Sequence, residues 1–401
     1  MHEQANKQPR ASPHLLLAGR HVPWPRHLII EITAFCNLKC RMCPKTHHAV
    51  NTQENQVMSW EVFERLTPLF PYIESLDLTG VWGEALMHPE LYVDMLKTIK
   101  AQGTDVYTTS NGTLLTDDLA RQLVELDLNK LMVSIDAATP ETYAWIRPPG
   151  KFAAVTGGLQ SLKAWKAKLG RTQPRVELAF VGMRSNIEEF PGVVRMAPEL
   201  GAAQVTLQAM GEYPGLENES VAAHHKPLGR RIYEEGQRIG RELDVRVALL
   251  PEDQFQEDRQ ERNALADTRR YRKQCYDLWN RALIAANGDV LPCCAAPMSM
   301  GNLRDASFAD IWRGPAYNAL RQQFLSGNLP EMCRLCTGTA WVEESAARDL
   351  RFFFAELLAP RVKRQAKRRL KRYAAARWLK RRWDGLKGKT QPASRLDSSH
   401  P

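Results

Sequence analysis

The stretch HLIIEITAFCNLKCRMCP, residues 27–44, predicts more about the fold than any other part of the chain. An apolar, β-rich run from Leu28 to Thr33 leads into three cysteines, Cys36, Cys40 and Cys43. Thiolates separated by three and then two residues can bind three irons of a 4Fe–4S cluster. Clusters that only carry electrons usually have four cysteine ligands, so this loop predicts that a small molecule completes the fourth iron, as catalytic metal sites keep an open position.

A zinc site is the competing interpretation of this loop. Structural zinc normally has four Cys or His ligands, and His47 and His48 are close enough in the sequence to supply the fourth. The chain after the loop favours the cluster, because it supplies the other parts of a barrel in order.

Short β-rich runs alternate with helical patterns from residue 27 to about 210, which is typical of βα units around a parallel sheet. Helix starts are recognisable at Ser59, Thr116 and Thr139, the last followed by Pro140 at the first helical position. The runs predict six strands: Leu28–Thr33, Ser75–Thr79, Asp105–Thr109, Leu131–Ile135, Val176–Val181 and Gln204–Gln208. We therefore expect an α/β fold, a partial (βα)6 TIM-like barrel.

The cysteine spacing, with Pro44 after it and the apolar strand before it, resembles the radical S-adenosylmethionine (SAM) superfamily. The resemblance implies a 4Fe–4S cluster on Cys36, Cys40 and Cys43, with SAM on the fourth iron. It also implies an oxidoreductase that reductively cleaves SAM to a 5′-deoxyadenosyl radical, which abstracts hydrogen from an organic substrate. A flavodoxin or ferredoxin-type protein is the expected electron donor.

In such barrels the working residues lie at the C-terminal ends of strands. After the second strand, residues 80–89 resemble the glycine-rich segment beside the methionine end of SAM, where Gly83 permits close approach and Glu84 accepts from the α-ammonium group. Val81 and Ala85 depart from the commonest family pattern. By the same resemblance, the ribose, carboxylate and adenine of SAM contact Ser110, Asn111, Ser134, Asp136, Arg147 and Met42.

Five of these residues also have a purely structural interpretation. Asn111 stands in an ordinary turn dipeptide, and Ser134 or Asp136 could cap the following helix. Arg147 could be a solvated surface arginine, and Met42 could serve packing alone.

Four later cysteines predict a second metal site. Cys275 is followed by Gly288 and Cys293 in a Cys-x12-Gly-x4-Cys spacing, and a hairpin turn is expected at residues 285–290. Cys333 and Cys336 follow a helical stretch, 307–326. This set resembles the short form of the SPASM or twitch extension of radical SAM oxidoreductases, which implies one auxiliary 4Fe–4S cluster on these four cysteines. A four-cysteine zinc ribbon is the alternative.

Cys294 is the eighth thiol and lies outside this ligand set. Three roles are open to it: it replaces Cys293 as a ligand, it packs inertly, or it donates a hydrogen atom to a product radical, as a free cysteine does in some radical SAM epimerases. An auxiliary cluster that takes an electron from the substrate radical favours dehydrogenation. A cluster that delivers an electron allows a redox-neutral epimerisation, so both outcomes stay open.

Composition and charge limit the class of protein. Eight cysteines in tight groups, with no signal peptide or transmembrane run before them, indicate metal chemistry in a reducing cytoplasm rather than disulfides. Residues 361–388 hold thirteen Lys/Arg against Asp384, a local charge of +12 in a chain of net charge +10, so the rest carries −2. Specific nucleic-acid binding by the barrel is therefore not expected. The basic run predicts an amphipathic tail, disordered at its end, that contacts an anionic inner membrane surface.

These patterns divide the chain into a lead-in (1–26), a radical SAM barrel (27–225), a linker with the auxiliary domain (226–345) and the tail (346–401). Peptide-modifying relatives often carry a sizeable N-terminal domain, and the lead-in is short. We therefore expect a small-molecule or lipid-linked substrate, specifically a sugar or cyclitol. A peptide maturase is the alternative among enzymes, and a non-catalytic iron–sulfur or zinc carrier is the alternative from another class.

Overall fold

A computed structural model of the chain describes residues 22–47, 56–252, 254–255, 271–275, 277–294, 298–336 and 340–343. The chain divides into two compact units, residues 1–344 and 345–401. The second unit, which holds the predicted basic tail, lies outside the described residues, as does most of the predicted lead-in.

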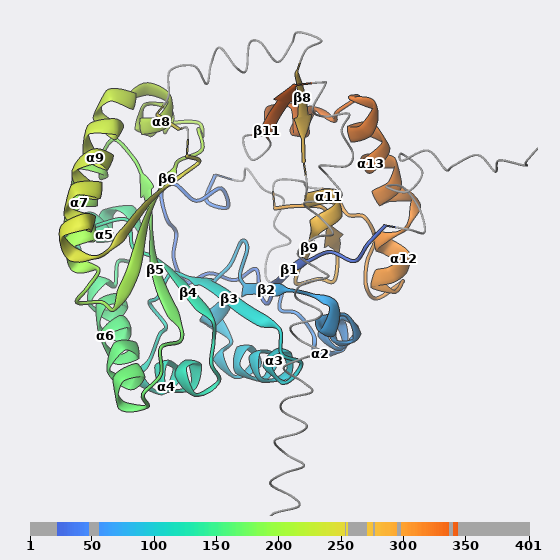
Figure 1. Cartoon of the computed structure of the whole chain (residues 1–401), viewed down its shortest axis with the longest axis horizontal. Coiled ribbons are helices and arrows are strands. Elements are labelled where there is room, and N and C mark those ends of the chain that lie inside the picture. Colours follow the sequence, from blue (N-terminus) through green and yellow to red (C-terminus); the bar gives the residue numbers. More distant parts are fainter. Residues whose placement is uncertain are drawn as a thin grey trace, which may run out of the picture. The chain divides into compact units, whose positions relative to one another are not determined.

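One sheet of nine strands organises the first unit, in the order β10-β9-β1-β2-β3-β4-β5-β6-β7 (Figure 1). From β1 to β7 each strand pairs in parallel with the next. The six predicted strands are confirmed as β1 (His27–Glu31), β2 (Ser75–Thr79), β3 (Asp105–Ser110), β4 (Lys130–Ser134), β5 (Arg175–Gly182) and β6 (Ala202–Ala209).

The sheet extends beyond the predicted strands at both edges. At one edge β7 (Arg246–Leu250) pairs with β6 after helix α9 (Lys226–Leu243), so the barrel sheet continues past residue 225, where the sequence suggested a linker. At the other edge β9 (Arg281–Ile284) pairs in parallel with β1. Buried Glu31 joins this edge by side-chain bonds, accepting from the backbone N–H of Trp82 at 3.0 Å and of Ala286 at 3.2 Å.

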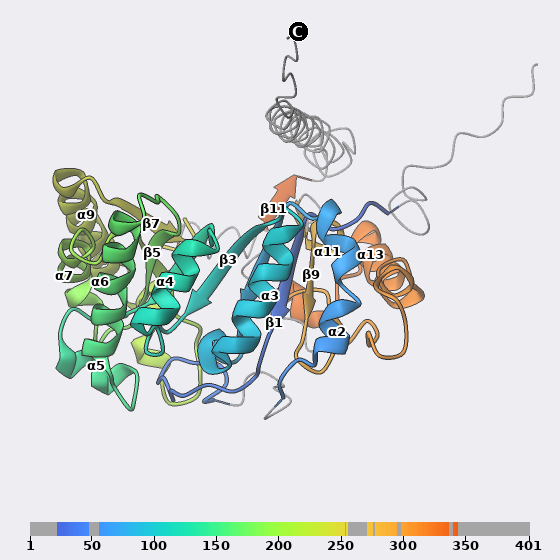
Figure 2. The same cartoon turned by 90° about the horizontal axis from the view of Figure 1, so that it is seen from below.

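Helices cover one face of the sheet, as Figures 1 and 2 show. The predicted helix starts are confirmed, because the side chains of Ser59, Thr116 and Thr139 accept from backbone N–H groups in the first turns. The barrel helices are α2 (Trp60–Glu64), α3 (Pro89–Ala101), α4 (Asp117–Glu125), α5 (Pro140–Ile146), α6 (Phe152–Lys168), α7 (Phe190–Met196), α8 (Val221–His224) and α9. Short 3₁₀ turns span Thr67–Tyr72, Ala85–Met87, Ile187–Glu189 and Glu217–Glu219.

Apolar strand side chains form the core between sheet and helices. Leu28, Ile30, Leu76 and Leu78 are fully buried, and each such side chain contributes about 1.5–3 kcal/mol relative to an exposed one. This rigid core fixes the C-terminal strand ends, from which the site is built.

The C-terminal part of the first unit contains β8 (Tyr271–Gln274), α11 (Asp277–Asn280), β9, β10 (Val290–Leu291), α12 (Phe308–Trp312), α13 (Pro315–Ser326), α14 (Glu331–Leu335) and β11 (Ala340–Glu343). The predicted hairpin is confirmed: β9 and β10 pair antiparallel, and Gly288 turns at φ 93°. The predicted helical stretch 307–326 is two helices instead of one. Pro315 lacks the N–H that would continue α12, so α13 starts afresh after Gly314.

Within the described residues, no helix combines the length and the apolar character that crossing a bilayer requires.

Candidate functional site

The cysteine loop, residues 36–43, follows β1 and is fixed by backbone bonds to the segment after α5. The N–H of Lys39 donates to the carbonyl of Pro148 at 2.8 Å, and that of Arg41 to the carbonyl of Ile146 at 2.9 Å. The loop is therefore tied to the barrel on the side of β4 and α5.

The three thiols of the loop lie close enough to influence one another. Burial raises the pKa of Cys40 to about 11, and the charges of Cys36 and Cys43 act in the same direction while Arg147 opposes them. Burial also raises the pKa of Cys36. Each thiol must lose its proton to bind iron, so cluster binding and thiol deprotonation are coupled.

A zinc site in this loop would need a fourth ligand beside the three thiols, and His47 and His48 were the candidates for it. The His47 ring instead stacks on Tyr213, with centroids 5.0 Å apart and planes 3° from parallel. His48 lies outside the described residues.

Gly83 makes a close backbone contact with the start of the cysteine loop. A Cβ on Gly83 would overlap the carbonyl oxygens of Thr33 and Phe35. The next residue continues the contact, because the N–H of Glu84 donates to the carbonyl of Phe35 at 2.6 Å. Gly83 thus packs the β2 loop against the cysteine loop.

Gly83→Ala should lower the free energy of unfolding by about 3 kcal/mol, the upper end of the usual cost of overpacking, because both backbones must move apart. Urea unfolding of the cluster-loaded protein under anaerobic conditions measures the effect. Gly157→Ala is the matched control: it lies in α6, where an added Cβ would have nothing within 4 Å, and it should stabilise by about 0.5–1 kcal/mol. Equal effects of both substitutions would contradict the packing role.

Glu84, Ser110 and Asn111 meet beside the loop. The buried Glu84 carboxylate accepts from Ser110 Oγ at 2.7 Å, from the N–H of Asn111 at 2.7 Å and from the N–H of Leu86 at 3.1 Å. Burial raises the pKa of Glu84, and these donors oppose the shift. The side-chain amide of Asn111 lies 4.0 Å from Cys36 Sγ, so Asn111 does more than form a turn.

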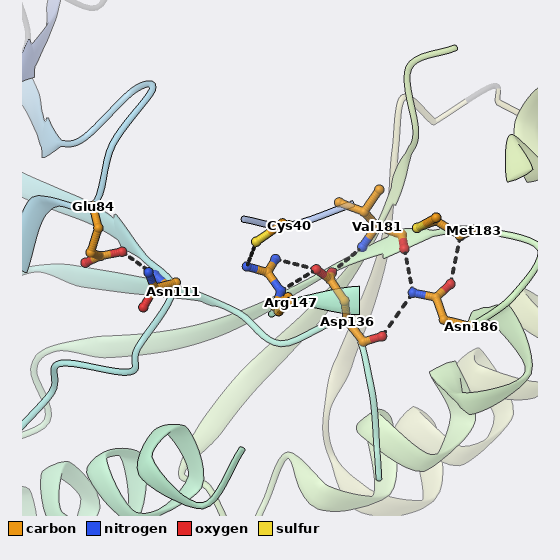
Figure 3. A network of polar contacts seen from close by, with 8 residues as sticks. All are labelled: Cys40, Glu84, Asn111, Asp136, Arg147, Val181, Met183 and Asn186. Atoms are coloured by element: carbon orange, nitrogen blue, oxygen red, sulfur yellow. Dashed lines mark hydrogen bonds and ion pairs between the residues drawn. The ribbon is translucent and has the colours of Figure 1, made fainter. Parts of the chain in front are cut away.

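Asp136 and Arg147 form a buried ion pair beside Cys40 (Figure 3). Asp136 accepts from Arg147 Nε at 2.6 Å and from the N–H of Val181 at 2.7 Å. Arg147 Nη1 in turn lies 3.6 Å from Cys40 Sγ. Burial alone would lower the pKa of Arg147, but the charges of Asp136 and Cys40 outweigh it and raise the pKa, so the guanidinium stays charged.

The structure decides between the functional and the purely structural interpretations of several of these residues. Thr139 caps α5, so Asp136 and Ser134 do not. Arg147 is buried and not a solvated surface residue. Ser134 is partly exposed at the end of β4. Met42 does pack, in a buried cluster with Ile146, Met183 and Met210.

The sequence did not single out several residues that lie near the thiols. Among the described residues, the buried Tyr143 hydroxyl has no hydrogen-bond partner. Burial raises its pKa to about 12, with Arg147 opposing and Cys40 reinforcing the shift. After β6, burial and the charge of Cys43 raise the pKa of Tyr213. Beside Tyr213, Glu212 pairs with His224 at 2.8 Å. The usable signal was their position: Glu212 and Tyr213 follow a strand end.

The later cysteines lie around the β9–β10 hairpin. Burial raises the pKa of Cys275 to about 11, Asp277 raises it further, and the N–H groups of Asp277 and Leu278 donate to its sulfur. Cys336 interacts electrostatically with both Cys275 and Cys294. Cys294 is exposed. Cys336 therefore lies near both Cys275 and Cys294, and Cys293 lies near buried Tyr317.

The described residues fit an iron–sulfur cluster with a bound SAM. Three thiols share one loop, and a buried carboxylate, a buried arginine and the unpartnered Tyr143 hydroxyl surround them. These groups match the ammonium, carboxylate and hydroxyl groups of an amino-acid nucleoside in charge and hydrogen-bonding capacity.

Comparisons with known proteins agree with this architecture. Residues 30–197 match the radical SAM superfamily, and residues 275–337 match SPASM, an iron–sulfur cluster-binding domain. The chain is 25% identical over 337 residues to the tungsten-containing aldehyde ferredoxin oxidoreductase cofactor-modifying protein of Pyrococcus furiosus, covering 78% of this chain and 87% of that protein. It is 26% identical over 309 residues to the AdoMet-dependent heme synthase of Methanosarcina barkeri, covering 72% and 82%.

Solved structures show the same fold. SuiB of Streptococcus suis bound to S-adenosylmethionine superposes with a TM-score of 0.57 at 16% identity, covering 79% of this chain and 72% of that one. The enzyme anSMEcpe with bound AdoMet superposes with a TM-score of 0.53 at 16% identity, covering 79% and 89%.

A parallel partial barrel with a three-cysteine loop after its first strand, followed by a cysteine-rich domain, defines a class of iron–sulfur enzymes. The chain belongs to the radical SAM superfamily and carries a C-terminal SPASM domain. It therefore uses a 4Fe–4S cluster with SAM in the barrel and auxiliary iron–sulfur binding in the SPASM domain, which the zinc and carrier alternatives do not explain.

Proposed function

We propose that this chain is a radical SAM oxidoreductase that abstracts hydrogen from a sugar or cyclitol and either dehydrogenates or epimerises it. The observation that carries this proposal is the set of polar and aromatic side chains at the barrel mouth, with Tyr213 beside Cys43. A flavodoxin or ferredoxin-type protein is the proposed reductant.

In the barrel, the proposed cluster ligands are Cys36, Cys40 and Cys43. When bound, the cluster and SAM supply one-electron cleavage of SAM to a 5′-deoxyadenosyl radical, and an auxiliary cluster supplies a one-electron acceptor. The protein's own part is to bind, to orient and to exclude water. Glu84 offers a buried acceptor for the α-ammonium group, and Arg147, held by Asp136, offers a donor for the carboxylate.

The remaining proposed SAM contacts follow from position. Ser110 and Asn111 orient Glu84, while Ser134 at the end of β4 faces the ribose in this proposal. Met42 closes the loop with its apolar neighbours, next to the adenine. Gly83 brings the β2 loop against the cysteine loop, so the Glu84 backbone stays close to the cluster ligands.

In the SPASM domain, the proposed ligands of the auxiliary cluster are Cys275, Cys293, Cys333 and Cys336. Cys294 is proposed as a hydrogen-atom donor, which its exposure supports. Its interaction with Cys336 makes exchange with Cys293 as ligand the competing role.

The substrate proposal rests on the mouth residues. Sugar and cyclitol rings present C–H faces that pack on aromatic rings and hydroxyl groups that bond to carboxylates and imidazoles. The His47–Tyr213 stack supplies the aromatic surface, and the Glu212–His224 pair supplies the polar groups. The stack lies next to the cysteine loop, because Tyr213 interacts with Cys43, and Glu212 is the neighbour of Tyr213 in the sequence.

A cofactor precursor is the second candidate substrate. It is favoured by the two relatives that align over most of their length, whose names describe cofactor modification and heme synthesis. A peptide substrate, as in a maturase, is the third class that an experiment has to separate.

Deuterium transfer tests the substrate class directly. The reconstituted enzyme is incubated anaerobically with SAM, reductant and one of three panels with deuterium on carbon: sugars and aminocyclitols, tetrapyrroles, or peptides. We expect deuterium in 5′-deoxyadenosine only with the first panel, because only a C–H bond seated beside the cysteine loop is attacked. Mass spectrometry of the nucleoside is the measurement.

The product then distinguishes the outcome. In a second reaction with the unlabelled substrate, a product two mass units lighter than the substrate indicates dehydrogenation. A product of equal mass indicates epimerisation. A variant without the three loop cysteines is the blank. Label from the tetrapyrrole or the peptide panel alone would replace the proposed substrate with that class.

A further inference from the structure

Arg321, on α13 in the SPASM domain, is a buried cation that pairs with no carboxylate among the described residues. Its side chain is 0% exposed, and it ranks among the largest fully buried side chains. Within the part of the chain that the structure describes, no carboxylate lies within ion-pair distance of it. A buried charge is costly unless it is paired, so this arginine calls for a physical explanation.

Neutral groups satisfy only part of the guanidinium. Nε donates to the carbonyl of Leu278 at 3.0 Å, and Nη1 donates to the carbonyl of Trp312 at 2.7 Å and to Asn318 Oδ1 at 3.2 Å. Nη2 has no hydrogen-bond partner in the described part of the chain. The guanidinium also lies 4.5 Å from the ring centroid of Trp312 and 4.8 Å from that of Tyr317. Burial lowers the pKa of Arg321 to about 10, so the side chain still carries its charge at neutral pH.

Two short connections lead from Arg321 to two of the auxiliary cysteines. The first passes through Leu278, whose N–H donates to Cys275 sulfur and whose carbonyl accepts from Arg321. The second passes through Tyr317, which contacts the guanidinium on one side and interacts electrostatically with Cys293 on the other. A single residue, Leu278 or Tyr317, therefore links the cation to each of two proposed ligands of the auxiliary cluster.

We propose that Arg321 is the internal counter-charge of the auxiliary iron–sulfur cluster and makes that cluster a better electron acceptor. The inference rests on the proposed ligand set of the SPASM domain. A cluster held by four thiolates carries net negative charge, and reduction adds one more, so a buried cation nearby stabilises the reduced form most. Net charge and solvent exposure are established determinants of cluster potential.

The competing interpretation is structural. The carbonyls of Leu278 and Trp312 belong to the short helices α11 and α12, and Arg321 could serve only to bond them. If Arg321 is a counter-charge, its positive charge is what the cluster requires. If Arg321 is structural, the several N–H donors of its planar guanidinium are what the two helices require. Arg321→Lys keeps the charge and loses the fork, whereas Arg321→Gln loses the charge and keeps donors.

The test is a redox titration of the reconstituted full-length protein, monitored by electron paramagnetic resonance. The wild type is compared with three variants: Arg321→Met, Arg321→Gln and Arg321→Lys. In both neutral variants we expect the equilibrium constant for one-electron reduction of the auxiliary cluster to fall about tenfold, which lowers its midpoint potential by about 59 mV. The lysine variant should stay close to the wild type. The barrel cluster in the same sample serves as an internal reference and should not shift.

Two controls separate the charge from disturbed packing. Leu320→Ala removes a buried apolar side chain from the same helix, α13, and leaves every charge in place. Arg304→Met removes an exposed charge from the same domain. Neither should move the auxiliary potential by a measurable amount.

Every outcome decides the proposal. Unchanged potentials in both neutral variants overturn it, and so does a shift in Arg321→Lys as large as theirs. If the neutral variants fail to bind auxiliary iron while the lysine variant binds it, the charge is needed for assembly and the proposal stands. Loss of auxiliary iron in all three assigns Arg321 to packing and overturns it. A wild type with only one cluster refutes the ligand set instead, which iron analysis shows separately.

Discussion

Replacing Cys36, Cys40 and Cys43 together by alanine should reduce the release of 5′-deoxyadenosine from SAM to the level of a protein-free blank. The three thiols are the only side chains of the loop that can bind iron, and without the cluster no electron reaches the sulfonium bond. Iron analysis should fall from about eight to about four irons per chain, because only the auxiliary cluster remains. Anaerobic reconstitution, iron and sulfide counting, and chromatography of the nucleoside are the measurements.

The matched control removes the same kind of ligand from the other cluster. Cys333→Ala combined with Cys336→Ala should also leave about four irons per chain, yet the cleavage of SAM should persist, because the barrel cluster is intact. Retained release in the triple variant would refute the assignment of the loop cysteines. Equal loss of release in both variants would show that the two clusters do not act separately.

The features predicted from the sequence are those with a local cause. The six strands follow from β-rich runs, and the helix starts follow from capping side chains such as Thr116 and Thr139, which act within one turn. The β9–β10 hairpin follows from a turn that contains Gly288. Such signals depend on neighbours in sequence, so they can be recognised without knowledge of the fold.

The features that were missed depend on distant contacts or on unusual packing. The parallel pairing of β9 with β1 joins residues some 250 positions apart, for example Leu28 and Ala282, and no local pattern encodes it. Strand β7 was missed because α9 carries several glycines, which weaken its helical signal. One of them, Gly240, approaches the Val245 carbonyl so closely that a Cβ would lie 2.5 Å from it.

In the site, too, some features could be predicted from local sequence and others depend on distant contacts. Strand ends pointed to Glu84, Ser110 and Asp136, and the structure brings Glu84 and Ser110 into direct contact. The sequence did not indicate that Asp136 and Arg147 neutralise one another, nor that the Tyr143 hydroxyl is buried without a partner. Those properties arise only when separate segments are packed together, since burial and pairing are features of the tertiary structure.

Asp136→Asn should lower the free energy of unfolding by about 3–5 kcal/mol, the usual cost of removing one partner from a buried ion pair. The substitution removes the carboxylate that pairs with Arg147, and it leaves the guanidinium charged and buried beside Cys40. Asp136 has a φ of 54°, a conformation that asparagine adopts readily, so the loss cannot be assigned to backbone strain. Urea unfolding of the cluster-loaded protein measures it.

A control and a double variant separate the charge from the shape of the site. Glu188→Gln breaks an exposed pair with Arg184, 3.8 Å apart, and should cost about 0.5 kcal/mol or less. Asp136→Asn combined with Arg147→Met removes both charges of the pair, so it should recover much of the lost stability. SAM affinity should not recover, because the proposed donor to the SAM carboxylate is gone. A double variant no more stable than Asp136→Asn alone would show that the pair stabilises the barrel through its hydrogen bonds and packing, and that the uncompensated charge is not the cause of the loss.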